Sequence, residues 1–153
     1  MRVYENSNEI YTLIRQFETG TLGRQNWTHA AHLTVGCWYL IHHGEALGTV
    51  YTRNGIKQYN NATCIDNTAT SGYHETITLF WLQIIRHYLL NTTSTSLLNL
   101  INQLIINYDN SELPFEYYSQ EQLMSKEARL FWVEPDLKPL QFTISLEQVF
   151  VAT

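Results

Sequence analysis

Proline is absent from the first 113 of the 153 residues, and the three prolines lie at positions 114, 135 and 139. Because proline is common in loops and disrupts the interior of helices, so long a stretch without it favours helices over a loop-rich β domain. Neither an internal repeat nor a linker divides the chain. We therefore expect a single helical domain over residues 1–153, long enough to bury a core.

Cysteine is also scarce, since Cys37 and Cys64 are the only two in the chain. No CxxC pair or cysteine-rich framework is present, which excludes a disulfide scaffold and a zinc site built on thiolates. Cys37 lies in an apolar helical stretch, where a thiol behaves as a small hydrophobic side chain, and we expect it to be buried.

Charge is low as well: charged residues make up 15% of the chain, the net charge is −5, and the nine lysines and arginines are scattered. No basic stripe is available to follow a phosphate backbone or an anionic bilayer, so neither a nucleic-acid nor a membrane partner is expected. The longest apolar stretch, residues 79–90, is interrupted by Gln83, Arg86 and His87 and is too short to span a bilayer. Because the N-terminus lacks a signal-peptide profile, we expect a cytoplasmic protein.

Apolar residues recur at helical spacing in five segments and predict five main helices. Thr28 is suited to be the N-cap of the second helix, and Gly44 supplies its C-terminal stop. Ser71 is the expected N-cap of the fourth helix, which is apolar on several sides and is therefore expected to be central. The expected ranges are about 4–18, 28–43, 45–61, 72–90 and 95–107.

Beyond Pro114 the pattern is weaker. Ser119 and Ser125 each begin a short helical segment, SQEQLM and SKEARLFW. The tail, residues 141–153, has some β character without an obvious partner, and we interpret it as coil or a short edge element. The predicted fold is all-α, an antiparallel helical bundle of about five main helices with a short helical or irregular C-terminal extension.

Two histidines interrupt the apolar face of the second predicted helix, in the stretch NWTHAAHLTVGCWYL. At about 100° per residue, His29 and His32 both fall within that face, and Gly36 leaves space one turn further along. Histidines at i and i+3 can reach one point beside a helix, a spacing used in helical metal sites. His74 lies on the buried side of the fourth predicted helix.

Three histidines on the core side of two helices are more than packing requires, and neutral imidazole is the commonest protein ligand for transition metals. We therefore expect His29, His32 and His74 to bind a divalent transition metal, Zn or Fe, with one position left open. Glu75 would be a fourth ligand or a general base, although the helical wheel points it away from the buried side. Arg129 would orient an anionic substrate.

Each of these residues also has a purely structural interpretation. The histidines can be hydrogen-bonded to the many tyrosine and threonine hydroxyls. Glu75 can complement the positive end of a helix dipole, and Arg129 can form an ion pair with Glu134 or Asp136.

The segments WTHAAHL, SGYHETIT and SKEARLFWVEPDLKPL together resemble a family of short, functionally uncharacterised bacterial proteins with the pattern THxxHL, GYHETxT and SxxARxxFxxPDLxPL. The likeness covers about residues 17–140 and implies a bacterial protein without implying an activity. A looser likeness, to the DinB-like helical metalloproteins, implies only a bundle with a histidine site, because their histidine spacing is not found here. The family segments contribute six polar residues of this chain: His29, His32, His74, Glu75, Arg129 and Asp136.

The leading hypothesis is a small bacterial protein with an interior histidine-rich site, a metal-dependent enzyme acting on a small molecule. The second is a metal-free module that binds a small organic ligand in a pocket lined by tyrosine, tryptophan and histidine. The third is a structural role in which the protein works through its surface as a homodimer. The distances among the three histidine rings test the first hypothesis against the other two.

Overall fold

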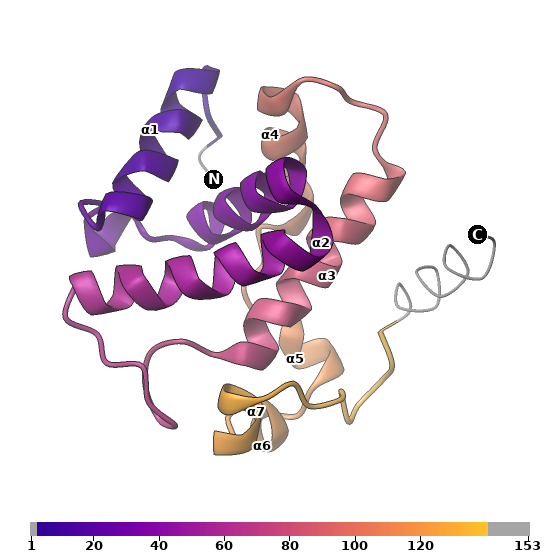
Figure 1. Ribbon diagram of the computed structural model, residues 1–153. Helices are drawn as coiled ribbons and strands as arrows, with labels where there is room; N and C mark the ends of the chain where they lie inside the picture. Colours follow the sequence, from indigo (N-terminus) through magenta and orange to yellow (C-terminus); the bar gives the residue numbers. More distant parts are fainter. Residues whose placement is uncertain (1–2, 141–153) are drawn as a thin grey trace.

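The computed structural model describes residues 3–140, and every regular element in that range is helical (Figure 1). The all-α prediction is therefore confirmed for these residues, whereas the finer arrangement as an antiparallel bundle of about five helices stays a prediction. The expected coil or edge element at 141–153 lies outside the described residues. The elements are α1 (Ser7–Thr19), the 3₁₀ turn η1 (Arg24–Asn26), α2 (His29–Ala62), α3 (Glu75–Asn91), α4 (Leu97–Tyr108), α5 (Pro114–Tyr117), α6 (Gln120–Leu123) and α7 (Lys126–Leu130).

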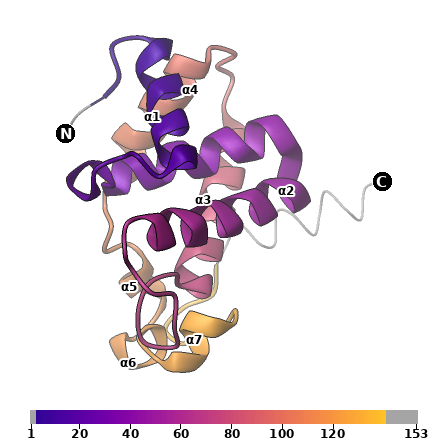
Figure 2. The same cartoon turned by 60° about the vertical axis from the view of Figure 1, so that its left-hand side comes forward.

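The long helix α2 is a helical hairpin, because Gly44 interrupts it with a left-handed φ of 77°. Figure 2 shows its two arms meeting at a sharp turn. Tyr39 and Tyr51, twelve residues apart, would be separated by about 18 Å along a straight helix, yet their ring centroids lie 5.8 Å apart. The predicted stop at Gly44 and the new helix from residue 45 are both confirmed.

Side-chain caps begin most of the helices, as the sequence predicts for Thr28, Ser119 and Ser125. The predicted cap at Ser71 is wrong. Gly72 adopts a left-handed φ of 77°, and α3 begins only at Glu75, with His74 as its N-cap. Pro114 opens the short helix α5 where the sequence suggested only irregular structure, because proline is well suited to the first turn of a helix.

The core consists of two hydrophobic clusters that share α3. The larger lies among α1, both arms of α2, α3 and α4, and it includes Phe17, which stacks on Trp27 and Tyr59. The smaller joins α3 to the segment from α5 to α7, which lies at the lower end of α3 in Figure 1. Cys37 is buried, as predicted. Within residues 3–140 no helix has the length and apolarity needed to cross a bilayer.

The segment after α7 is tied to α3 by one buried hydroxyl. Thr76 donates its Oγ1 hydrogen to the carbonyl oxygen of Phe131 at 2.8 Å and accepts from the backbone N–H of Val133 at 3.2 Å. Tyr118 adds a hydrogen bond to the Val133 carbonyl at 2.7 Å. These bonds hold residues 131–133 beside α3. Residues of this segment and its neighbours line both of the pockets described below.

Candidate functional site

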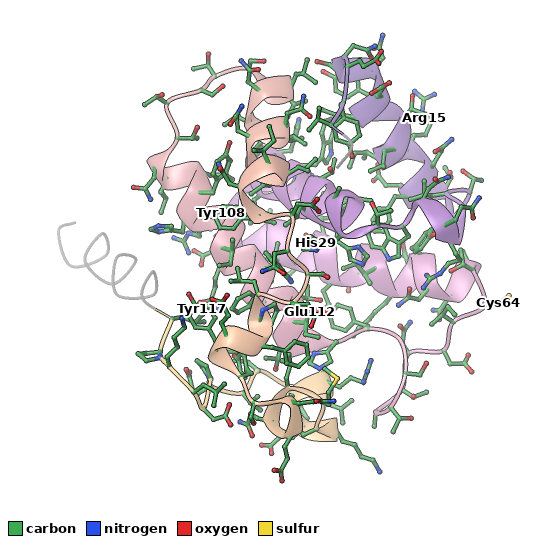
Figure 3. All side chains as sticks on the ribbon, turned by 180° about the vertical axis from the view of Figure 1, so that it is seen from behind. Arg15, His29, Cys64, Tyr108, Glu112 and Tyr117 are labelled. Carbon is green, nitrogen blue, oxygen red and sulfur yellow. The ribbon has the colours of Figure 1, made fainter. Side chains whose placement is uncertain are left out.

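His29 joins the first arm of α2 to the end of α4. Its Nε2 donates to the carbonyl oxygen of Tyr108 at 2.9 Å, and Figure 3 shows the two residues together between these helices. The imidazole also packs on Trp81 of α3, with the ring centroids 4.5 Å apart. His29 is half-buried, so the prediction that it faces the interior is confirmed in part.

His32 is exposed, and its predicted place in the buried face is wrong. The indole of Trp27, just before α2, offers a flat apolar surface on which the imidazole lies, with the ring centroids 3.7 Å apart. Its Nδ1 donates to the carbonyl oxygen of Thr28 at 2.7 Å, one turn back in the same helix. Both contacts are with residues four or five positions earlier in the chain, so the ring lies beside the start of its own helix.

His74 is buried and uses both ring nitrogens. As the N-cap of α3 it accepts from the backbone N–H of Ile77 through Nδ1 at 3.1 Å. Its Nε2 donates to the carbonyl oxygen of Leu123 at 2.8 Å. Since one nitrogen carries the proton and the lone pair of the other is occupied, the neutral ring has no lone pair left for a metal.

The three histidines do not assemble into a common centre. His29 meets α3 at Trp81, seven residues or about 10 Å along the helix from His74. Among residues 3–140 no group of three histidine, cysteine or carboxylate side chains is placed to hold a metal ion. The described residues therefore give the expected Zn or Fe site no support, and the positions of His29 and His74 are explained by the hydrogen bonds that join helices.

The buried imidazole of His74 predicts a pH dependence of stability. Burial, helped by the nearby charge of Arg129, lowers the pKa of His74 below its ordinary value of 6.5. Between the two pKa values the unfolded chain binds the proton more readily than the folded chain. The contribution of His74 to the free energy of unfolding should therefore hold steady above pH 6.5, fall as the pH drops below it, and level off below the folded pKa of His74.

Urea unfolding of the wild type and His74→Asn between pH 5 and pH 8 measures this contribution. Asparagine can still cap a helix but does not titrate, so the wild type should lose more stability than the variant on acidification. Parallel profiles for the two proteins would contradict the prediction.

Glu75 is the first residue of α3 and belongs to a half-buried polar network. Its Oε1 accepts from Arg53 Nε at 3.0 Å and from the Tyr73 hydroxyl at 2.6 Å. Only 17% of the Glu75 side chain is exposed. Burial and the hydrogen bond to Glu75 raise the pKa of Tyr73. The hydrogen bond from Arg53 to Glu75 raises the pKa of Arg53. The network pairs Glu75 with Arg53 and Tyr73 instead of leaving it available to a metal.

Arg129 does not form the ion pair that the sequence suggested. It donates from Nη1 to the carbonyl oxygen of Gly72 at 2.7 Å. Asp136 instead accepts from the backbone N–H and the hydroxyl of Ser119, at 2.8 and 2.6 Å, which lowers its pKa. Glu134 accepts from the indole nitrogen of Trp132 at 3.0 Å. Both predicted partners are thus occupied by other groups.

Glu75 and Arg129 nevertheless line one pocket, here called the polar pocket, of about 530 Å³. Lys57, on the second arm of α2, lies with its Nζ 5.0 Å from the centre of the Tyr73 ring. Sequence reasoning missed Lys57, although its i, i+4 spacing from Arg53 places both cations on one helix face. The lining residues are Lys57, Asn61, Asp66, Asn67, Thr68, Tyr73, Glu75, Arg129 and Leu130.

The ion pairs of the described residues leave two cations and one carboxylate of the polar pocket unpaired, namely Lys57, Arg129 and Asp66. Among the described residues, neither Lys57 nor Arg129 has a carboxylate oxygen within 4.0 Å, and Arg53 offsets the charge of Glu75. Asp66 and Lys57 are both exposed, so water screens their charges, whereas Arg129 is half-buried. The arrangement can hold an anionic group between an arginine and a lysine.

No protein-family model, curated protein or solved structure matches this chain. The three-segment resemblance therefore stays a prediction, and the function rests on the pocket itself.

Proposed function

We propose that this protein is a metal-free binding module that holds a small anionic organic molecule, a carboxylate or a phosphate ester, in the polar pocket. The observation that carries the proposal is the pair of cations, Lys57 and Arg129, that line one pocket without a carboxylate partner in the described residues. An arginine fork and a lysine are the usual protein donors to carboxylate and phosphate oxygens.

The surrounding contacts support a preformed site. Arg129 is positioned by its bond to Gly72, and Tyr73 is positioned by its bond to Glu75. Asn67 donates to the Lys57 carbonyl and accepts from the Tyr73 N–H, which links the loop before α3 to the second arm of α2. A site built on such fixed groups pays little to order itself when a ligand binds.

Inorganic phosphate and acetate are suitable first probes, titrated separately into the ¹⁵N-labelled protein and followed by NMR. We expect the amide signals of Gly72, Tyr73 and Leu130 to move together along one saturating curve. Arg129→Gln should weaken binding about tenfold, because a charge-assisted hydrogen bond contributes about 1.5–3 kcal/mol. Lys57→Gln should weaken it about threefold, since Lys57 is more exposed.

Arg15→Gln is the matched control, because it removes the same charge from an exposed position on α1 that lies far from α3 in Figure 3. It should leave the titration unchanged. Equal weakening by Arg15→Gln and Arg129→Gln would identify the effect as general electrostatics and overturn the proposal. Thermal unfolding of each variant confirms that the fold is kept.

A further inference from the structure

A second cavity, of about 640 Å³, lies between the second arm of α2 and α3 and is here called the apolar cavity. It is distinct from the polar pocket: Arg53 lines this cavity, and its partner Glu75 lines the other. Its volume lies in the range of sites for small organic molecules. The walls are formed by Leu40, Glu45, Ala46, Thr49, Val50, Arg53, Leu79, Leu82, Gln83, Arg86, Trp132, Glu134 and Leu140.

The charged residues of the apolar cavity are already satisfied. Arg86 forms an ion pair with Glu45, and Arg53 forms one with Glu75. Glu134 accepts the indole hydrogen of Trp132. Both arginines are thus already paired with carboxylates, and Glu134 already accepts one hydrogen bond, so the largely apolar walls favour an uncharged molecule over an anion.

One polar atom in the wall is not satisfied. The side-chain oxygen of Gln83 is buried and has no hydrogen-bond partner among residues 3–140. Buried acceptors almost always have a partner, and each one left unpaired costs free energy. Gln83 lies on α3 and lines this cavity together with Leu79, Leu82 and Trp132. A turn of its terminal amide toward the cavity would present this oxygen to a donor on a ligand.

We propose that the apolar cavity binds an uncharged, mainly apolar organic molecule that donates one N–H or O–H hydrogen bond to Gln83 Oε1. This second site goes beyond the proposed anion binding and does not depend on it. The apolar walls contribute most of the affinity by removing ligand surface from water. The Gln83 oxygen contributes the selectivity, because a ligand without a donor leaves it unpaired.

Indole and 1-methylindole are a matched pair of probes, since they share one ring system and only indole has an N–H donor. Each is titrated into the full chain and followed by NMR, with phosphate absent. Indole should shift the signals of Ala46, Leu79 and Leu82 and bind about five- to tenfold more tightly than 1-methylindole. Equal affinities, or tighter binding of 1-methylindole, would overturn the proposal.

Gln83→Leu removes the acceptor while keeping an apolar side chain of similar size. The variant should bind both probes with equal affinity, and Gln58→Leu, at an exposed position of α2, should keep the wild-type preference for indole. Contacts between the Leu79 or Leu82 methyl groups and residues 141–153, detected as nuclear Overhauser effects in the ligand-free protein, would also overturn it. In that case the chain itself would fill the cavity.

Discussion

His74→Ala is expected to lower the free energy of unfolding by about 2–4 kcal/mol. The loss of the N-cap of α3 contributes about 1 kcal/mol, and the carbonyl of Leu123, left unpaired in the core, contributes about 1–3 kcal/mol more. Leu123 is fully buried and ends α6, so the substitution should also loosen the segment from α5 to α7. Urea unfolding measures the first effect, and amide hydrogen exchange in α6 and α7 measures the second.

His74→Asn separates the two contributions. Asparagine restores the helix cap but is too short to reach Leu123, so its cost should be smaller than that of alanine by about 1 kcal/mol. His29→Ala is a useful comparison, because it removes a single bond to a carbonyl at a half-buried position and should cost less than His74→Ala. A cost below about 1 kcal/mol for His74→Ala would show that the bond to Leu123 does not hold α6 in place.

Thr76→Val should lower the free energy of unfolding by about 2–3 kcal/mol, although it preserves shape. The change removes a hydroxyl that serves as donor to Phe131 and as acceptor from Val133, so two backbone groups lose their partner at once. Thr76→Ser keeps the hydroxyl and loses one methyl group, so it should cost only about 1 kcal/mol. Thermal and urea unfolding of the pair measure the difference.

The same substitution tests the link between Thr76 and both pockets. Phe131 lies between Leu130 of the polar pocket and Trp132 of the apolar cavity. Thr76→Val should therefore weaken phosphate binding and indole binding together, measured under conditions where the variant is folded. Unchanged affinity for both probes would show that the segment after α7 is held by other contacts.

Local features of the fold were predictable from the chain. Gly44 was expected to end a helix, and it does so because only glycine adopts its left-handed φ without a steric cost. Thr28, Ser119 and Ser125 were expected to cap helices, since each can accept from an N–H three residues ahead. These hydrogen bonds form within one turn of helix, so both partners lie within a few residues of each other in the sequence and can be predicted from it.

Two residues of the candidate site were predictable from the sequence, but their contacts were not. Glu75 and Arg129 were selected from the sequence, and they do line one pocket. The expected ion pair of Arg129 with Glu134 or Asp136 was wrong, because Arg129 donates to Gly72, 57 residues away. The pairing of Glu75 with Arg53, 22 residues away, was not predicted. The helical wheel placed Glu75 away from the buried side of α3, yet Arg53 on the second arm of α2 pairs with it there.

By itself the sequence determined that this chain is helical and where most of its helices begin and end, because periodicity and capping act over three or four residues. It also predicted histidines near the core, which holds for His74 and in part for His29. Only the tertiary structure decided what those histidines do. His74 caps a helix and reaches Leu123, 49 residues away, and that distant carbonyl, which no local pattern reveals, occupies the nitrogen that a metal would need.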